Sequence, residues 1–397
     1  MKRAIWLQET RAMKFQQTQS DWEAGRLTQE EAAQILGICE RSFRRYLVKY
    51  DEGGIDALTD RRLNQPSRRK APLEERIKLA DMYKHSFSSY NVRHFHQIYT
   101  ERGGVNGQVR SYSWIKSVLQ GQQLVKVAKA RGKHRIKRER KPLPGMMIHQ
   151  DASTHRWVPH EVWDLVVTLD DATSEHLDMR FVAQEGTASS MAGIKAVLQT
   201  KGIPSSFYSD RGAHYWSTPK AGGKVDKINL TQFGQAMKRL GIEMIAAYSP
   251  EARGRSERAF GTHQGRLPQE LASSGITTMQ EANSYLTNHY MPSFNKYFAC
   301  AAAQEGTAYV PLRGFDVDEV LSQRYERVVG NDNCVSFEGM KLQIPADQHR
   351  YHYVRTKVHV CMNCEGQISI YHGPRLLADY DEHGHLIEPQ RRNGTTG

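Results

Sequence analysis

The segment M-M-I-H-Q-D-A-S at residues 146–153 is a short apolar run that ends in an acidic side chain, Asp151. A second run, I-P-S-S-F-Y-S-D-R-G at 203–212, ends in the same way at Asp210. Short apolar runs bounded by polar residues predict buried strands, so each aspartate is expected at the end of a strand. Two such carboxylates meet only if the fold brings them together.

A third acid, Glu257, lies in Y-S-P-E-A-R-G-R-S-E-R-A-F at 248–260, which is typical of a loop that enters a helix. Three converging carboxylates would offer the all-oxygen ligand set that Mg²⁺ prefers. Each acid also has a structural alternative, because Asp and Glu at strand ends are frequent turn residues and helix caps. Rival acids for the first and third positions are Asp164, Asp170, Asp171, Glu243 and Glu251.

Residues 142–300 are expected to form an α/β core that carries the three acids. Pro142 and Pro144 mark its start. Periodicity predicts the order β-β-β-α-β-α-β-α. The predicted strands are 146–153, 163–169, 177–183, 203–210 and 242–246, and the predicted helices are 188–201, 229–240 and a last one from Glu257 toward Leu271.

Basic residues are concentrated before this core. The chain of 397 residues has a formal net charge of +12. Residues 1–145 hold 30 Lys and Arg against 15 Asp and Glu, whereas the other 252 residues hold 25 against 28. The asymmetry predicts a nucleic-acid-binding front half joined to a near-neutral catalytic half, with a merely solvated N-terminal region as the alternative.

Residues 1–60 are expected to form a helix-turn-helix. Thr28 and Glu31 have the spacing of a capping box, and Gly37 predicts the turn before a second helix that begins near Glu40. In that helix an apolar stripe of Phe43, Leu47 and Tyr50 leaves the basic residues on other faces, where a recognition helix would contact the major groove. An ordinary helical hairpin is the alternative. The expected DNA contacts are Arg41, Ser42, Arg44, Arg45 and Lys49.

Residues 61–125 predict a second helical DNA-binding module. Its first helix follows Pro72, with Leu73, Ile77, Ala80 and Lys84 on one face; a second helix carries Val92 to Tyr99, and Ser111 is expected to cap a third. The expected DNA contacts of the third helix are Arg110, Ser113 and Lys116.

Residues 126–141 form a basic linker with nine Lys or Arg and one Glu. Such a block is expected to lie along DNA phosphates, which adds affinity without sequence reading. A nuclear-localisation signal is a weaker interpretation. The linker residues expected to contact DNA are Lys133, Arg135, Lys137 and Arg138.

Residues 301–380 alternate polar and apolar side chains in short runs separated by turns, which predicts a small antiparallel β-barrel of the SH3-like kind. Residues 381–397 are expected to form a disordered tail. His359, Cys361 and Cys364 suggest zinc, but a fourth ligand at a suitable spacing is missing, so paired strand and turn residues are the preferred interpretation.

The three acidic segments together resemble known motifs. Y-S-P-E-A-R-G-R-S-E-R-A-F-G-T resembles the signature around the third acid of the retroviral-integrase superfamily, with Gly254 three residues before Glu257. S-D-R-G-A-H-Y resembles the segment at the second acid, and I-H-Q-D-A-S-T resembles the first. With the helix-turn-helix, residues 25–370 resemble a bacterial insertion-sequence DDE transposase of the ISNCY group.

This resemblance implies a multidomain chain with a ribonuclease-H-like core and assigns Asp151, Asp210 and Glu257 as catalytic and metal-binding residues. It implies two Mg²⁺ or Mn²⁺ ions, double-stranded DNA as partner, and a homodimer or higher oligomer on DNA. Arg258 is expected to contact DNA phosphate. The departure from the family is the interval of 46 residues between Asp210 and Glu257, longer than usual, which fits a polar insertion at 217–227.

The resemblance also bears on the rival acids. Glu257 fits the frame G-x-x-E-R and is preferred over Glu251 and Glu243, while the rivals for the first position belong to a strand that the family does not use. A non-catalytic DNA-binding regulator is the main alternative function, and a plain ribonuclease H or nuclease is a weaker one.

The remaining sequence features concern compartment and energy source. The N-terminus M-K-R-A-I-W-L-Q-E-T has no apolar signal region, and no run is long enough for a membrane helix. Five cysteines in a long chain favour reduced thiols. No G-x-x-x-x-G-K-[ST] loop is present, so ATP use is not expected. A bacterial cytoplasmic protein associated with the nucleoid is predicted, with no membrane partner.

Overall fold

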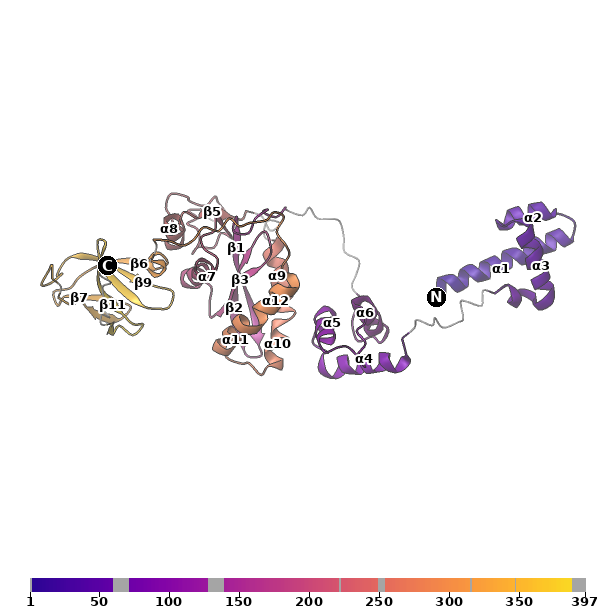
Figure 1. The fold of residues 1–397 in the computed structure, drawn as a ribbon, viewed down its shortest axis with the longest axis horizontal. Coiled ribbons are helices and arrows are strands. Elements are labelled where there is room, and N and C mark those ends of the chain that lie inside the picture. Colours follow the sequence, from indigo (N-terminus) through magenta and orange to yellow (C-terminus); the bar gives the residue numbers. More distant parts are fainter. Residues whose placement is uncertain are drawn as a thin grey trace. The chain divides into compact units, whose positions relative to one another are not determined.

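The computed structural model of this chain divides into two compact units, Met1–Met82 and Tyr83–Gly397. Figure 1 shows the helices and strands of both units. The division falls inside helix α4 (Leu73–Ser86). The residues that the structure describes are 2–59, 71–127, 139–220, 223–248, 254–314, 316–346 and 348–387.

The first unit contains the predicted helix-turn-helix, made of α2 (Gln29–Leu36) and α3 (Glu40–Gly53), followed by a short 3₁₀ helix, η1 (Gly54–Leu58). Thr28 and Glu31 form the predicted capping box. The sequence did not predict α1 (Lys2–Glu23). Its C-terminal half packs on the other two helices, where Phe15, Trp22, Ala32, Ala33 and Phe43 share a hydrophobic cluster.

The second helical module contains α5 (Val92–Glu101) and α6 (Tyr112–Gly121). Ser111 caps α6 as predicted, and Asn91, which was not predicted as a cap, accepts a hydrogen bond from a backbone amide at the start of α5. Phe95, Tyr99, Ile115 and Leu119 are buried. The expected face of α4 was wrong, because Leu73 and Ile77 are exposed whereas Leu79 and Tyr83 are buried.

Helix α5 contacts the core through polar bonds. His94 Nε2 lies 2.9 Å from Glu270 Oε1, and Arg266 Nη1 donates to Gln97 Oε1 at 2.7 Å. Helix α5 therefore faces the core. The DNA contacts predicted for this module lie on α6 and in the segment just before it.

The core is a five-stranded mixed sheet in the order β3-β2-β1-β4-β5. The strands β1, β2 and β3 pair antiparallel, whereas β1, β4 and β5 pair parallel. All five strands occur where the sequence predicted them. Their bounds are β1 Ile148–Val158, β2 Glu161–Asp170, β3 His176–Val182, β4 Ser206–Ser209 and β5 Glu243–Ala246.

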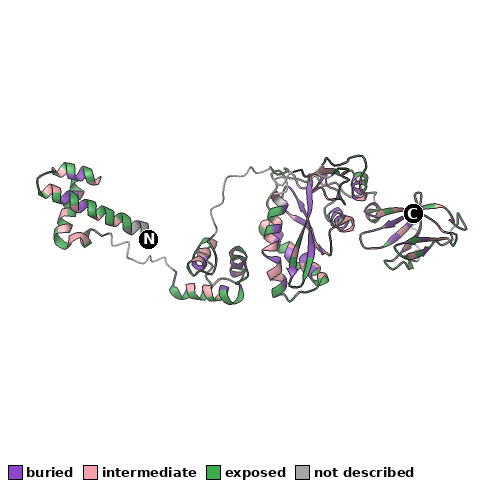
Figure 2. Ribbon diagram, turned by 180° about the vertical axis from the view of Figure 1, so that it is seen from behind, coloured by how far each residue is buried: buried purple, intermediate pink, exposed green. Residues whose placement is uncertain are grey.

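Helices cover both faces of this sheet (Figure 1). One hydrophobic cluster joins the sheet to α7 (Thr187–Thr200) and α8 (Gln232–Arg239) through residues such as Ile194, Phe207 and Phe233. The other joins it to the later helices through Phe181 and Leu267. Figure 2 shows the strands of the sheet buried between these layers.

The later helices differ from the expected single helix toward Leu271. Helix α9 (Gly254–Gln264) ends before Pro268, which occupies the first turn of α10 (Leu267–Ser273), because proline is tolerated there and not inside a helix. The chain then forms α11 (Met279–Tyr285), a π-helical turn η4 (Leu286–Tyr290) and α12 (Met291–Phe298).

The C-terminal strands form a five-stranded antiparallel sheet, β12-β11-β10-β9-β6, and a two-stranded sheet, β7-β8. The expected barrel is not confirmed, since the strands described between residues 316 and 387 do not close on themselves. Residues 381–387, expected in the tail, form a turn and β12. The elements are α13 Val317–Val320, β6 Gln323–Val328, β7 Cys334–Phe337, β8 Met340–Gln343, β9 Lys357–Met362, β10 Ile368–His372, β11 Arg375–Tyr380 and β12 Leu386–Ile387.

In the part of the chain that the structure describes, no helix has the length and apolar character needed to cross a bilayer. Of the basic linker, residues 126–127 and 139–141 are described. Arg140 Nη1 donates to Ser174 Oγ at 2.7 Å, and the backbone amide of Lys141 donates to Asp171 Oδ2 at 2.8 Å, so the end of the linker is attached to the core.

Candidate active site

Asp151 and Asp210 lie at the same level of two neighbouring parallel strands. Strand β1 pairs with β4 in a register that sets His149 opposite Tyr208. Two residues further along each chain stand Asp151, which is inside β1, and Asp210, which directly follows the end of β4. Equal steps along paired strands advance equally, so the register brings the two aspartates side by side.

The two aspartates line one small cavity of about 10 Å³, which also involves Ser256 of α9. Three segments far apart in the sequence, β1, the end of β4 and the start of α9, therefore meet there. The space is about that of one water-sized particle.

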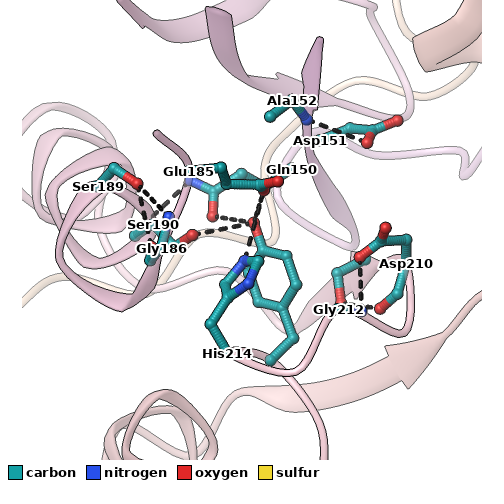
Figure 3. A network of polar contacts seen from close by, with 12 residues as sticks. Gln150, Asp151, Ala152, Glu185, Gly186, Ser189, Ser190, Asp210, Gly212 and His214 are labelled. Atoms are coloured by element: carbon teal, nitrogen blue, oxygen red, sulfur yellow. Dashed lines mark hydrogen bonds and ion pairs between the residues drawn. The ribbon is translucent and has the colours of Figure 1, made fainter. Parts of the chain in front are cut away.

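Backbone amides hold one oxygen of each carboxylate, as Figure 3 shows. The amide of Ala152 donates to Asp151 Oδ1 at 3.0 Å, and the amide of Gly212 donates to Asp210 Oδ1 at 2.9 Å. Asp151 is 8% exposed, so its carboxylate faces the cavity from a mostly buried position. These bonds restrict the orientation of both side chains.

Glu257 is not brought into this cavity. It is exposed on α9, whereas its neighbour Ser256 is buried and lines the cavity. Among the residues that the structure describes, no three His, Cys, Asp or Glu side chains are arranged to hold a metal ion. Of its rivals, Glu251 lies outside the described residues, and Glu243 lines a separate cavity beside α8.

The three aspartates that are rivals of Asp151 accept hydrogen bonds from other residues of the core. Asp170 accepts hydrogen bonds from the amides of Gly145 and Ala172, which is the behaviour of a turn residue. Asp171 Oδ1 lies 2.7 Å from His149 Nε2, and Asp164 accepts a bond from Thr154 Oγ1. All three aspartates therefore make contacts within the core, and their interpretation as turn residues stays a prediction.

A buried polar network, which the sequence analysis missed, supports the segments that carry the two aspartates. Tyr215 donates from its hydroxyl to Gln150 Oε1 at 2.9 Å, and Ser190 Oγ donates to the Tyr215 hydroxyl at 3.1 Å. Gln150 Nε2 in turn donates to Thr168 Oγ1 at 2.9 Å. The network therefore joins β1 to β2, to α7 and to the loop after β4.

Glu185 and His214 extend this network (Figure 3). Glu185 Oε1 lies 3.3 Å from the Tyr215 hydroxyl and 3.4 Å from His214 Nε2. Burial raises the pKa of Tyr215 well above its ordinary value, and the nearby carboxylate of Glu185 raises it further, so the hydroxyl stays protonated. Tyr215 and His214 belong to the motif S-D-R-G-A-H-Y, so the sequence could have identified them as candidate site residues. Glu185 lies in no motif and could not have been identified in this way.

The expected DNA contacts occupy different environments. On α3, all but Ser42 of the expected residues are exposed, and Ser42 Oγ lies 3.3 Å from Cys39 Sγ. Arg110 lies over the Trp114 ring at 5.4 Å, and Arg258 is exposed on α9. Ser113 is exposed and Lys116 is half-buried on α6. The linker residues Lys133, Arg135, Lys137 and Arg138 lie outside the described residues.

Comparison with known proteins identifies relatives over most of the chain. A family model described as winged helix-turn helix matches residues 22–76, which confirms the predicted motif. The transposase-like protein y4bF of Sinorhizobium fredii is 27% identical over 380 residues, covering 92% of this chain and 81% of its own. The transposase for insertion sequence IS1202 of Streptococcus pneumoniae is 27% identical over 393 residues, covering 89% and 84%.

Two of the solved structures that align with this chain are of viral proteins. A chain of the simian T-cell lymphotropic virus intasome, solved in complex with PP2A regulatory subunit B56 gamma, aligns with 79% of this chain and 100% of its own at 13% identity and a TM-score of 0.33. The HTLV-2 integrase catalytic core domain, solved in complex with magnesium, aligns with 37% and 88% at 15% identity and a TM-score of 0.28.

Proposed function

Because this chain is similar over most of its length to an insertion-sequence transposase and to a transposase-like protein, we propose that it is a metal-dependent DNA transposase. The helix-turn-helix binds the ends of an insertion sequence, and the core cleaves and joins DNA strands. The observation that carries the proposal is the common level of Asp151 and Asp210 on paired parallel strands, because it directs two carboxylates to one point.

We assign Asp151, Asp210 and Glu257 as the catalytic residues that hold two Mg²⁺ or Mn²⁺ ions. Carboxylate oxygens are suitable ligands for these hard cations. Two of the three residues line one cavity, and Glu257 directly follows Ser256, which lines it too. Glu257 is therefore the described acid of the signature motif that adjoins a cavity residue in the sequence.

Asp151, Asp210 and Glu257 would hold the two divalent cations, which would activate the attacking oxygen and stabilise charge on the phosphate. The chain contributes positioning. The pairing of β1 with β4 sets the level of the aspartates, and the bond between Gln150 and Tyr215 joins their flanking segments. Because Ala152 and Gly212 hold one oxygen of each carboxylate, less conformational freedom is lost on binding.

The reaction would proceed in two steps at one site. Hydrolysis at the end of the element exposes a 3′-hydroxyl, and this hydroxyl then attacks a target phosphodiester. No covalent bond between protein and DNA is required. At least two protomers act together on DNA, because two ends must be cut and joined, and the reaction takes place in the bacterial cytoplasm, on the nucleoid.

We assign the DNA-contacting residues from the helix or segment on which each residue lies. Arg41, Arg44, Arg45 and Lys49 lie exposed on α3, where a recognition helix would contact the major groove. Arg110, Ser113 and Lys116 belong to α6 and the segment just before it. The linker residues and Arg258 would contact phosphates. The C-terminal sheets, an SH3-like module in this proposal, would add DNA or protein contacts.

The test is cleavage and joining of a labelled end duplex in Mg²⁺, Mn²⁺ or EDTA. Asp151→Asn, Asp210→Asn and Glu257→Gln should each lower metal-dependent joining by on the order of 10³-fold, as removal of a group that acts in the transition state does. Glu305→Gln, at an exposed position to which no role is assigned, is the matched control and should retain wild-type joining. Loss in Glu251→Gln with retention in Glu257→Gln would reassign the third ligand.

A non-catalytic DNA-binding regulator is the second candidate, favoured by the lack of a three-acid metal cluster among the described residues. It predicts tight, sequence-specific binding of the end duplex without cleavage in any metal. Binding that is lost in Arg45→Ala while cleavage of a bound end is also absent in the wild type would support the regulator over the transposase.

A further inference from the structure

Residues 211–239, here called the basic segment, run from the residue after Asp210 through the 217–227 insertion to the end of α8. They hold six Lys or Arg and one acidic residue, whereas the rest of 142–300 holds nine against fourteen. The core is otherwise acidic, so this segment forms a local concentration of positive charge directly after a candidate catalytic residue.

The four lysines of the basic segment are exposed: Lys220, Lys224, Lys227 and Lys238. Within the described ranges, none of the four has a carboxylate partner in an ion pair. Some other cations of the core are paired, for example Lys201 with Glu175 at 2.9 Å. Exposed cations without a local counter-charge attract phosphate groups.

The base of the insertion is ordered by bonds to residues beside the candidate active site. Arg211 Nη1 donates to the carbonyl oxygen of Gly223 at 3.0 Å, and its guanidinium lies 5.3 Å from the centre of the Tyr248 ring. The Tyr248 hydroxyl accepts from the amide of Val225 at 3.4 Å. Because Arg211 follows Asp210 directly, the insertion is attached to the chain that carries the second aspartate.

Asp226, the acidic residue of the basic segment, uses its carboxylate to stabilise a turn. Asp226 Oδ1 accepts from the amides of Ile228 and Asn229, at 2.7 Å and 3.1 Å, and Asp226 Oδ2 accepts from Asn229 Nδ2 at 2.7 Å. These bonds lower the pKa of Asp226, the side-chain bond most. Its carboxylate therefore stabilises the turn before α8 rather than neutralising a lysine.

A cavity of about 360 Å³ lies beside this surface, at the edge of the sheet. It is lined by Lys227 of the insertion, Lys238 of α8 and residues of strand β5, among them Met244 and one carboxylate, Glu243. Two lysines from separate elements thus border the same cavity, so their positive charges lie close to one another at the protein surface.

We propose that the basic segment is a phosphate-binding surface for the target DNA duplex. The inference rests on the proposed transposase function, since it names the DNA held beside that same site. Lysines attract phosphates as point charges and do not read base sequence. Such a surface suits DNA of variable sequence, whereas the insertion-sequence ends are recognised by the helix-turn-helix. The 217–227 insertion thereby gains a role in target capture.

The test compares the full chain with Lys220→Ala/Lys224→Ala/Lys227→Ala. The matched control, Arg156→Ala/Lys201→Ala/Lys296→Ala, removes the same charge from exposed positions of the core outside the basic segment. Binding of a random-sequence duplex is measured at several salt concentrations without metal. The slope of log affinity against log salt should fall by roughly 2 to 3 in the first variant, about 0.9 for each phosphate that a lysine no longer neutralises, and less in the control.

Joining of a pre-cleaved end to target DNA should fall by about tenfold in the first variant, with cleavage of the end unchanged, because weaker target binding slows only the second step. A salt slope equal to that of the wild type would overturn the proposal. Equal losses of end cleavage and joining would overturn the assignment to target DNA. A wild-type chain inactive in every metal would contradict the transposase function, while the salt slope would still decide whether the surface binds DNA.

Discussion

The hydroxyl group of Tyr215 donates a 2.9 Å hydrogen bond to Gln150 Oε1, and this bond joins the strand that carries Asp151 to the loop that begins at Asp210. Both residues are buried. The relationship means that the spacing of the two aspartates depends on a side-chain bond as well as on strand pairing. A small displacement of catalytic groups is expected to lower the rate strongly.

Tyr215→Phe removes this bond and keeps the ring. Metal-dependent joining should fall by about tenfold, since the loop of Asp210 loses its link to β1. The free energy of unfolding should fall by about 1–3 kcal/mol, because the buried partners Gln150 and Ser190 lose a hydrogen bond. Joining kinetics and urea unfolding measure the two effects.

Tyr380→Phe is the matched control for that variant. The Tyr380 hydroxyl donates to the carbonyl oxygen of Gln343 at 2.7 Å, between two C-terminal strands and away from the aspartates in the sheet order. Tyr380→Phe should lower the free energy of unfolding by an amount similar to that in Tyr215→Phe and should leave the rate of joining unchanged. A joining rate that falls equally in both variants would show that Tyr215 acts only through stability.

Gly193 allows α7 to approach the sheet. A methyl group at this position would collide with Gln150 Nε2 and with Thr168 Oγ1. Gly193→Ala should therefore lower the free energy of unfolding by about 1–3 kcal/mol, the usual effect of overpacking. In Gly261→Ala no neighbour lies within 4 Å, so that variant should gain about 0.5–1 kcal/mol from helix propensity. Urea unfolding that ranks Gly193→Ala at or above the wild type would contradict the close packing.

Much of the core could be predicted because its strands are continuous apolar runs and its aspartates stand at their ends. The side-by-side placement of Asp151 and Asp210 needs only parallel pairing of the two strands. Caps such as Thr28 were predictable for a local reason, since a capping box is a contact between residues three apart.

The features of the fold and of the candidate site that could not be predicted depend on contacts between residues far apart in the sequence. Helix α1 buries Thr18 and Gln19 together with Phe15, so it has no apolar stripe for the sequence to display. Glu185 belongs to no motif, and its position beside Tyr215 arises only when α7 packs on the sheet. The exposed position of Glu257 likewise depends on how α9 meets the core.

A buried histidine pair predicts acid sensitivity. His176 Nε2 lies 3.0 Å from His263 Nε2, and His263 Nδ1 lies 2.9 Å from the Tyr290 hydroxyl. Burial lowers the pKa of His176 to about 4 from an ordinary 6.5, and burial lowers that of His263 as well. Between pH 6.5 and about 4 the unfolded chain binds protons that the folded chain excludes, so stability should fall as the pH falls through this window.

For His176 alone the full effect is about 3 kcal/mol, and the part between pH 6.5 and 5 is about 2 kcal/mol. His176→Gln should reduce the pH dependence of urea unfolding by that amount over that interval. His352→Gln is the control, since that histidine is exposed, and should leave the dependence unchanged. A wild-type stability that stays constant from pH 6.5 to 5 would be incompatible with a neutral buried pair.

Lys195 of α7 connects the core to the C-terminal sheets. Its Nζ lies 2.7 Å from Asp318 Oδ1 on α13 and 2.6 Å from Glu365 Oε1 on the turn between β9 and β10. Lys195→Met keeps the apolar stem and removes the charge. Because Lys195 is largely buried while its partners are half-exposed, the loss in unfolding free energy should be about 2 kcal/mol, between the values for surface and buried pairs.

The same change should loosen the segment between α12 and α13, so that trypsin cuts at Arg313 several-fold faster while the separate sheets stay folded. Lys341→Met is the control, because its ion pair with Asp332 is exposed on both sides and should contribute less than about 1 kcal/mol. Limited proteolysis of both variants beside the wild type measures the difference. Equal rates of cleavage at Arg313 in the two variants would mean that apolar contacts, and not Lys195, hold the C-terminal sheets on the core.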